Sequence, residues 1–265
     1  MEIRITFYGN LDFFLHPTLK EPPQMMHVIR RSTSVKDGIE ACGVPHTEVG
    51  TIYVNGVLSD FDRIIIGGDF VDVFPITPPM DVTKKSFLRP DALEMPRFVA
   101  DVNVGKLASL LRLMGLDTAY EQEWKDSQIA ELALREDRIV LTRDRLLLKR
   151  KTVVFGHLVR TESPWQQLQE VIDFYSLFQW LQPFSRCTYC NKILRMVSKE
   201  AILDQLEPLT RMFYHEFTQC PSCGRVFWPG SHRERIKNRV MNILKKRGKL
   251  GLQDNINIGT LFNDM

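Results

Sequence analysis

The sequence lacks any long hydrophobic run. No apolar segment in its 265 residues approaches the roughly 20 residues that a membrane-spanning helix requires. The first residues, from Met1 to Tyr8, alternate apolar and polar side chains, whereas a signal peptide places a basic end before an apolar block. We therefore expect a cytoplasmic protein without a membrane segment.

The chain also lacks a strong excess of charge and the motifs of several enzyme classes. Its 35 Lys and Arg residues against 32 Asp and Glu residues give a formal net charge of +3, which does not by itself indicate nucleic-acid binding. No serine lies in a G-x-S-x-G elbow, the six histidines are scattered, and Gly67 and Gly68 lack the companions of a nucleotide-binding loop. The length is enough for two or more domains.

Cysteine is scarce, and four of the five cysteines form two Cys-x-x-Cys pairs. Cys187 and Cys190 are separated from Cys220 and Cys223 by twenty-nine residues. A two-residue spacer lets both thiolates of a pair point at one ion, and two pairs complete a closed tetrahedral site of the structural zinc type. Two disulfides or a redox Cys-x-x-Cys motif are the alternatives, although a reducing cytoplasm favours thiolate-bound zinc. The fifth, Cys42, stands among apolar residues and is expected to be buried.

The amino-terminal part has the pattern of a β-grasp, ubiquitin-like domain. Apolar residues alternate from Ile3 to Phe7 as in a strand, Asn55-Gly56 marks a turn, and the segment 68–74 is typical of a closing strand. The turn and the closing strand resemble those of sulfur carriers, but Phe74 and Pro75 stand where a sulfur carrier ends in a free Gly-Gly tail. We therefore assign this domain a binding or positioning role, such as recruitment of a protein partner.

Strands and helices alternate from Arg97 to about Leu181. The predicted strands are 98–100, 118–120, 138–142 and 152–155, and the predicted helices are 107–114 and one that starts at Asp126. This alternation predicts an α/β domain with a mostly parallel sheet.

Three aspartates occupy positions where such a sheet binds ligands. Asp101 follows the first predicted strand, Asp144 follows the third, and Asp126 opens a helix. Carboxylates about 4 Å apart repel each other by roughly 4 kcal/mol at an effective dielectric constant near 20, so a cluster of them holds a divalent ion or keeps a proton. Carboxylate ligands suit magnesium or manganese. The alternatives are helix capping by Asp101 and Asp126, and a surface ion pair of Asp144 with a neighbouring arginine.

Basic residues near these acids and at the carboxyl end are candidates for binding an RNA backbone. The region from Arg233 to Lys249 carries eight basic residues against one acid. A solvated basic surface is the alternative for all of these positions. The candidate RNA-binding residues are Lys106, Arg112, Arg143, Arg145, Arg233 and Arg235.

Read together, these motifs resemble the Mut-seven carboxy-terminal RNase domain family, in which a PIN-like nuclease fold is fused to a zinc ribbon. The resemblance lies in F-V-A-D, which ends at Asp101, and in L-T-R-D-R, which contains Asp144. It also lies in the two cysteine pairs: Cys190 is followed by asparagine, and Cys223 is followed by G-R-V-F-W-P-G-S-H. It covers roughly residues 97–241, and a preceding ubiquitin-like module is a known arrangement in this family.

The resemblance implies a metal-dependent ribonuclease. Asp101 and Asp144 match the acidic positions of the family, Asp126 matches the acid at the head of the following helix, and Asp117 and Asp137 are candidates for a fourth acid. The predicted segments are a ubiquitin-like domain (1–80), a linker (81–96), a PIN-like nuclease domain (97–181), a zinc ribbon (182–241) and a basic tail (242–265).

Three functions are consistent with this pattern. The first is an endoribonuclease that uses an Asp-bound magnesium or manganese ion, together with structural zinc. The second is a non-catalytic RNA-binding adaptor that uses the zinc ribbon, the basic tail and the ubiquitin-like domain. The third is a protein-interaction module whose nuclease half is vestigial. Dependence of RNA cleavage on the metal separates the first from the other two.

Overall fold

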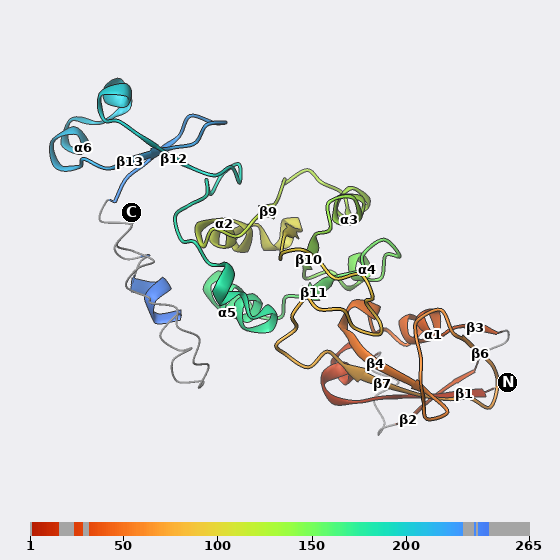
Figure 1. Cartoon of the computed structure of the whole chain (residues 1–265). Coiled ribbons are helices and arrows are strands. Elements are labelled where there is room, and N and C mark those ends of the chain that lie inside the picture. The colour runs from red at the N-terminus through yellow and green to blue at the C-terminus, as the bar shows by residue number, and fades with distance from the viewer. Residues whose placement is uncertain (1, 16–23, 29–31, 230–235, 237, 244–265) are drawn as a thin grey trace. The chain divides into compact units, whose positions relative to one another are not determined.

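The computed structural model describes residues 2–15, 24–28, 32–229, 236 and 238–243 (Figure 1). The chain forms two compact units, one of Met1–Gly105 with Ala119–Ser176 and one of Lys106–Thr118 with Leu177–Met265. Among the described residues, no helix is long and apolar enough to cross a membrane.

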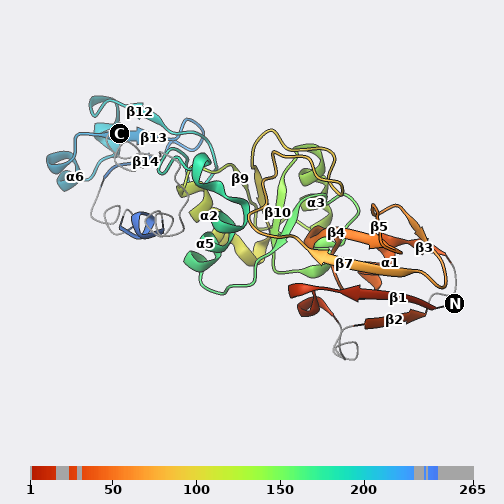
Figure 2. The same ribbon diagram turned by 60° about the horizontal axis from the view of Figure 1, so that its bottom comes forward.

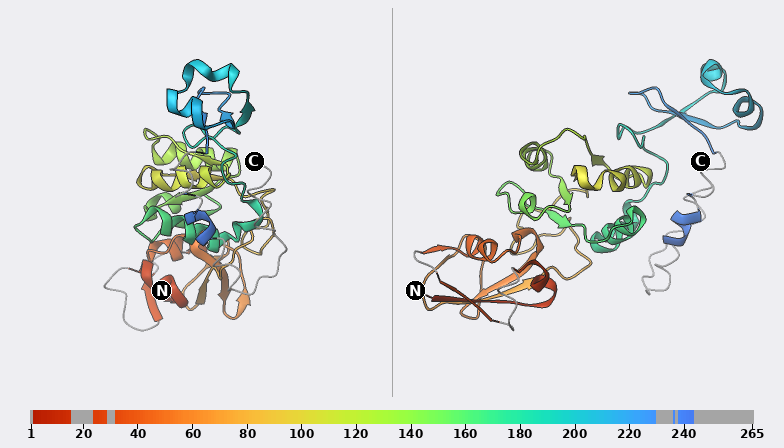
Figure 3. Two further views of the ribbon diagram at one scale, coloured as in Figure 1. Left: turned by 90° about the vertical axis from the view of Figure 1, so that its left-hand side faces the viewer. Right: turned by 180° about the vertical axis from the view of Figure 1, so that it is seen from behind.

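The amino-terminal part of the first unit is a β-grasp domain. Its five-stranded sheet has the order β2-β1-β7-β4-β5, with β1 and β7 parallel and the other pairs antiparallel (Figure 2). The helix α1 (Val35–Ala41) lies on one face of this sheet (Figure 3) and is capped by Ser34, whose hydroxyl accepts from the Asp37 amide. The strands are β1 (Glu2–Phe7), β2 (Gln24–Val28), β4 (Val49–Val54), β5 (Val57–Leu58) and β7 (Phe70–Pro75), with a small sheet of β3 (Thr33–Ser34) and β6 (Ile64–Ile65).

Two short 3-10 helices complete this domain. They are η1 (Gly9–Phe14), which follows β1, and η3 (His46–Glu48), which precedes β4. The predicted strand pattern and ubiquitin-like fold are confirmed.

The rest of the first unit is built on a mostly parallel sheet of the order β11-β10-β8-β9, in which β10 runs parallel to both β8 and β11. The α/β prediction is therefore confirmed. The elements are β8 (Phe98–Ala100), η4 (Val102–Val104), β9 (Thr118–Ala119), α3 (Asp126–Arg135), β10 (Ile139–Thr142), α4 (Arg145–Leu148), β11 (Gly156–Leu158) and α5 (Pro164–Tyr175).

The fourth predicted strand, 152–155, is wrong in position. The strand is β11, which begins at Gly156, and Val153 lies before it in a turn. In the predicted segment Val153 is buried but Val154 is 43% exposed, and the carbonyl oxygen of Val153 lies 2.8 Å from Nε2 of His46 in the β-grasp domain. Burial of a short apolar segment does not distinguish a strand from a packed turn.

One continuous hydrophobic core joins the β-grasp domain to the α/β sheet. Ile5 in β1, Val140 in β10 and Leu147 in α4 belong to the same cluster of buried side chains. The two parts are thus a single packed body within the first unit.

The segment 81–96, predicted as a linker, is packed against the β-grasp domain. Arg89 in it is only 3% exposed, and its guanidinium donates to the carbonyl oxygens of Val49 at 3.0 Å, Thr47 at 2.9 Å and His46 at 3.3 Å. Burial lowers the pKa of Arg89 to about 10. The cost of burying this cation is offset by the three carbonyl groups.

The second unit combines α2 (Gly105–Leu113) with a small ribbon. The three antiparallel strands of the ribbon pack around Ile202, Leu206 and Phe217. Gly115, which ends α2 at φ +85°, has no room for a side chain because a Cβ there would overlap the carbonyl oxygen of Gln182. The remaining elements are η5 (Leu177–Trp180), β12 (Arg195–Val197), η6 (Glu200–Gln205), α6 (Pro208–Phe213), β13 (Phe217–Gln219) and β14 (Val226–Phe227).

Candidate functional site

Asp101 lies at the carboxyl end of β8, where it caps η4. Its Oδ1 accepts from the Val102 amide at 2.6 Å, and its Oδ2 accepts from Thr142 Oγ1 at 2.7 Å and from Asn103 Nδ2 at 2.5 Å. The residue is 5% exposed. The capping alternative is thus correct for Asp101, but three hydrogen bonds also fix the carboxylate in one orientation, as a preformed ligand requires.

Thr142 joins this carboxylate to Asp144. The Thr142 hydroxyl donates to Asp101 and accepts from the Asp144 amide at 2.8 Å. Asp144 in turn caps α4, because its Oδ1 accepts from the Leu146 amide at 2.7 Å. Asn103 closes the group, since its Oδ1 accepts from the Arg143 amide at 3.0 Å. The structure therefore brings Asp101 and Asp144 together at one edge of the sheet.

Asp126 is not joined to this pair. It is the first residue of α3, whose N-cap is Lys125, and its Oδ2 lies 3.9 Å from Arg150 Nη2. In the described part of the chain, the only group of three or more His, Cys, Asp or Glu residues with ligand atoms within 4.8 Å of one another consists of cysteines. A role for Asp126 beside Asp101 and Asp144 stays a prediction.

The two candidates for a fourth acid have different surroundings. Asp117 accepts from Asn191 Nδ2 at 2.9 Å and lies 3.6 Å from Arg186 Nη2, within the second unit. Asp137 is exposed and has a left-handed backbone with φ +51° after the end of α3. Asp117 is therefore engaged in holding the ribbon, and the role of a fourth acid stays a prediction for both residues.

Two of the predicted RNA-binding arginines are engaged inside the protein. Arg112 is 4% exposed, which corrects the expectation that it reaches a phosphate from the surface. Arg145 is half-buried and donates to main-chain carbonyl oxygens of the β-grasp domain. Lys106 and Arg143 are exposed, as RNA contact requires, whereas Arg233 and Arg235 lie outside the described residues.

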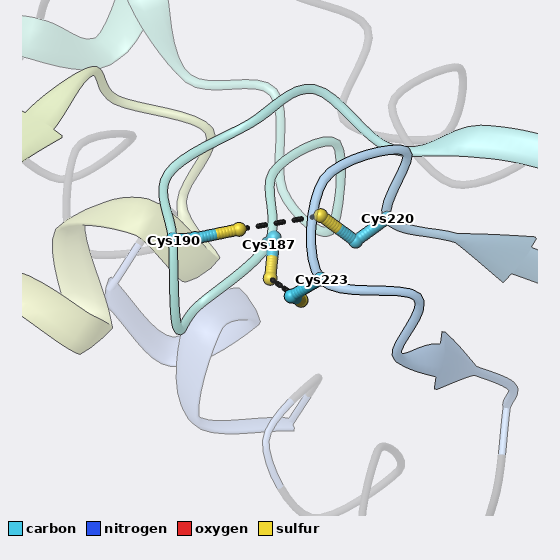
Figure 4. A group of neighbouring side chains, drawn as sticks. All are labelled: Cys187, Cys190, Cys220 and Cys223. Atoms are coloured by element: carbon cyan, nitrogen blue, oxygen red, sulfur yellow. Dashed lines mark hydrogen bonds between the residues drawn. The ribbon is translucent and has the colours of Figure 1, made fainter.

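The four paired cysteines converge on one point. Their sulfur atoms all lie within 4.8 Å of one another. Sγ of Cys187 is 3.7 Å from that of Cys223, and Sγ of Cys190 is 3.3 Å from that of Cys220, so each short distance joins one Cys-x-x-Cys pair to the other (Figure 4). Four sulfurs placed about 2.3 Å from one zinc ion in a tetrahedron lie about 3.8 Å apart. The arrangement fits zinc, and the cysteines are not disulfide-bonded.

The two cysteine turns have the same backbone. In each, the residue four positions after the first cysteine has positive φ, +65° at Asn191 and +70° at Gly224, and its amide donates back to the carbonyl oxygen of that cysteine at 3.0 Å. Asparagine and glycine are the residues that tolerate this conformation best. The local sequence thus shapes both halves of the metal site.

Sequence reasoning missed the buried role of Arg112 at this site. Its guanidinium donates to the carbonyl oxygens of Thr188, at 3.3 Å, and Tyr189, at 2.5 Å, which are the two spacer residues of the first cysteine pair. Its Nε donates to the carbonyl oxygen of Thr118 at 2.8 Å. The only signal in the sequence was that Arg112 directly follows Leu110 and Leu111 on the apolar stretch of this helix.

The thiols of the cluster have different acidities. Burial is the main influence that raises the pKa of Cys187 to about 12. Burial would also raise that of Cys220, but hydrogen bonds from the amides of Cys223 and Ser222 and from neighbouring thiols lower it to about 7. These hydrogen bonds favour the thiolate form of Cys220, which a zinc ligand requires, whereas burial disfavours that form at Cys187.

Comparison with known families agrees with the fold. The family described as the Mut7-C RNAse domain matches residues 96–240, and the family described as Mut7-C ubiquitin matches residues 1–81. No curated protein and no solved structure matched the chain. Because the first match covers more than half of the sequence, the chain belongs to the Mut7-C RNase domain family and carries a Mut7-C ubiquitin domain before the RNase domain.

Proposed function

We propose that the protein is a metal-dependent endoribonuclease with a PIN-like site at Asp101 and Asp144. The observation that carries the proposal is the bridge made by Thr142, which holds these two residues side by side at the carboxyl edge of the sheet in a chain of an RNase family. This edge is where α/β sheets bind their ligands.

The residues at this edge suit magnesium or manganese. Both ions prefer carboxylate and water oxygens and leave positions open for a phosphate. A bound ion of this kind activates water and neutralises charge at the scissile phosphodiester. The carboxylate of Asp101 is held by Thr142 and Asn103, while Asp144 keeps its backbone amide and one carboxylate oxygen in hydrogen bonds that fix its position.

Asp126 is proposed as a third ligand. Its ion pair with Arg150 is 3.9 Å long and joins two partly exposed side chains. Such a pair contributes about 0–1 kcal/mol, so a divalent ion competes with it easily. On metal binding, the carboxylate of Asp126 would leave Arg150 and become a ligand of the ion.

The remaining parts of the proposal concern zinc, RNA and location. Structural zinc is proposed for the cysteine cluster. The exposed Lys106 and Arg143 and the carboxyl-terminal basic residues are proposed to bind the RNA backbone, in a cytoplasmic protein. The ubiquitin-like domain is proposed to bind a protein partner or to position the nuclease.

The proposal is tested by RNA cleavage with the full chain. End-labelled single-stranded RNA is incubated with the protein and Mn²⁺, with and without a chelator. Cleavage is expected with the metal only, and it should be lost in Asp144→Asn while RNA binding is retained. Glu131→Gln is the matched control, because it removes one exposed carboxylate from α3 of the same fold.

Salt-sensitive RNA binding without cleavage by the wild-type protein would instead support the RNA-binding adaptor.

The basic stretch is tested separately by neutralising Arg233, Arg235, Lys237 and Arg239 together. For single-stranded RNA, each lost phosphate contact reduces the slope of the logarithm of the binding constant against the logarithm of the salt concentration by about 0.7. A slope unchanged in this variant would assign the RNA path to other residues.

A further inference from the structure

The residue directly after Asp144 is held by the ubiquitin-like domain. Arg145 is the first residue of α4, and its Nη1 donates to the Phe14 carbonyl oxygen at 3.1 Å while its Nη2 donates to the Phe13 carbonyl oxygen at 3.3 Å. A planar guanidinium holds donors on two separate nitrogens in a fixed fork, which suits two successive carbonyl groups. Both acceptors belong to η1 of the β-grasp domain.

The side chains of the same two phenylalanines enclose this contact. The Arg145 guanidinium lies 4.8 Å from the centre of the Phe13 ring and 5.3 Å from that of Phe14. Arg160 lies over the same two rings, at 5.0 and 5.1 Å, and its Nη2 is 3.4 Å from Glu48 Oε2. Two arginines of the α/β sheet region thus stack on an aromatic pair of the ubiquitin-like domain.

The other end of α4 is held by the same domain. Lys149 caps α4 at its carboxyl end, and its Nζ donates to the Glu40 carbonyl oxygen at 2.7 Å. Within α4, the buried Leu147 packs in the core that this helix shares with the β-grasp domain. A four-residue helix is too short to be stable alone, so its position depends on these anchors.

We propose that Arg145 is a positioning residue through which the ubiquitin-like domain fixes the start of α4, and with it the carboxylate of Asp144. The expected effect of Arg145 on catalysis rests on the proposed nuclease function, whereas its role in fixing the start of α4 does not. The domain then acts as a built-in support of the active site. The guanidinium of Arg145, which was predicted to bind RNA, contacts the carbonyl groups and aromatic rings of Phe13 and Phe14 in the protein itself.

The test compares Arg145→Lys with the wild-type full chain. Lysine keeps the positive charge but replaces the two Nη donors by a single ammonium nitrogen, so it cannot reproduce both contacts in the fork geometry of Arg145. Amide hydrogen exchange of Leu146, which donates to Asp144 Oδ1, is followed by NMR without RNA or metal. We expect exchange about fivefold faster or more, because the first turn of α4 opens more often. Phe13→Ala, at a side chain 46% exposed, should accelerate it by about twofold, since the ring is lost and the carbonyl remains.

Arg4→Ala is the matched control. Arg4 in β1 lies over the ring of Phe70 in β7 at 5.3 Å, within the same domain, and this pair does not include a residue of α4 or η1. Loss of this stacking should leave Leu146 exchange unchanged.

In the Mn²⁺-dependent cleavage assay, Arg145→Lys should lower kcat by about tenfold with little change in KM, as expected when a metal ligand is misplaced while charge is retained.

The outcomes separate this inference from the proposed function. If the wild-type protein cleaves no RNA, the exchange rates still decide whether Arg145 positions the start of α4. Leu146 exchange at the wild-type rate in both folded Arg145→Lys and folded Phe13→Ala would overturn the inference. A rise in KM alone would also overturn it, because that result identifies Arg145 as a phosphate ligand.

Discussion

Arg112 donates a hydrogen bond to the carbonyl oxygen of Tyr189, seventy-seven residues away in the sequence, inside the spacer of the first cysteine pair. This contact makes a helix side chain part of the support of the metal site. Groups that orient metal ligands from outside the coordination shell commonly contribute 10–100-fold to metal affinity.

Replacing Arg112 by lysine should therefore weaken the metal site and the second unit together. Lysine has a single donor nitrogen in place of Nε and Nη1 of Arg112, so it cannot reach all three carbonyl oxygens in the same geometry. Each buried acceptor left without a donor costs about 1–3 kcal/mol of stability. We expect a lower melting temperature and faster transfer of zinc to a chelator. Arg195→Lys, at an exposed position of β12 in the same unit, is the control and should change neither. Equal zinc release from both variants would contradict the bracing role.

Loss of one metal ligand should have a larger effect. Binding of zinc at sites of this type contributes about 10–16 kcal/mol in peptides, as much as the whole stability of a domain. The purified chain should contain one zinc ion, and Cys223→Ser should lose it and unfold the ribbon. Cys42→Ala is the control, because Cys42 is a buried free cysteine of the first unit that belongs to neither Cys-x-x-Cys pair, and burial raises the pKa of its thiol to about 11. Far less than one zinc per wild-type chain would exclude the structural zinc site.

Asp101 and Asp144 should respond differently to replacement by asparagine. The Asp101 carboxylate accepts three hydrogen bonds, and an amide with one acceptor oxygen cannot keep all of them, so Asp101→Asn should lose about 1–3 kcal/mol of stability. Asp144 accepts one capping bond from Leu146, and asparagine caps helices as well as aspartate does. Asp144→Asn should thus remain near wild-type stability in urea unfolding while cleavage is lost. Equal destabilisation of the two variants would show that Thr142 does not hold the Asp101 carboxylate in solution.

The sequence was sufficient to predict the elements that rely on local patterns. Alternating apolar residues revealed β1, and an apolar strand followed by an aspartate revealed the edge at Asp101 and Asp144. The spacing of the cysteines revealed the cluster, because the Cys-x-x-Cys turn is itself a local structure.

What the sequence did not reveal depends on distant backbone groups. In the sequence, three arginines look like ordinary surface residues: Arg89, Arg112 and Arg145. In the structure, each of them donates to a backbone carbonyl oxygen that is distant in the sequence, by 40, 77 and 132 residues, respectively. A carbonyl group is present at every residue, so no side-chain pattern marks the acceptor. The packing of segment 81–96 was missed for the same reason.

A partly buried carboxylate on α5, that of Glu170, predicts how stability depends on pH. Burial would raise the pKa of Glu170, but hydrogen bonds from His157, from the Arg160 amide and from the amide and hydroxyl of Thr161 outweigh it and lower the pKa from 4.5 to about 2. Because the folded pKa lies below the unfolded one, this contribution is complete above about pH 4.5 and is lost as the pH falls toward 2. A shift of this size corresponds to about 3 kcal/mol at neutral pH.

Glu170→Gln should remove this part of the stability and flatten the acid side of the stability curve. Urea unfolding followed between pH 6 and pH 3 measures both effects, because stability of the wild-type protein should fall more steeply with acid than that of the variant. Glu162→Gln, an exposed carboxylate in the segment before α5, is the control and should follow the wild-type curve. Parallel curves for wild type and Glu170→Gln would mean that Glu170 has the same pKa in the folded and unfolded chains, and its hydrogen bonds to residues 157–161 would then contribute nothing to acid sensitivity.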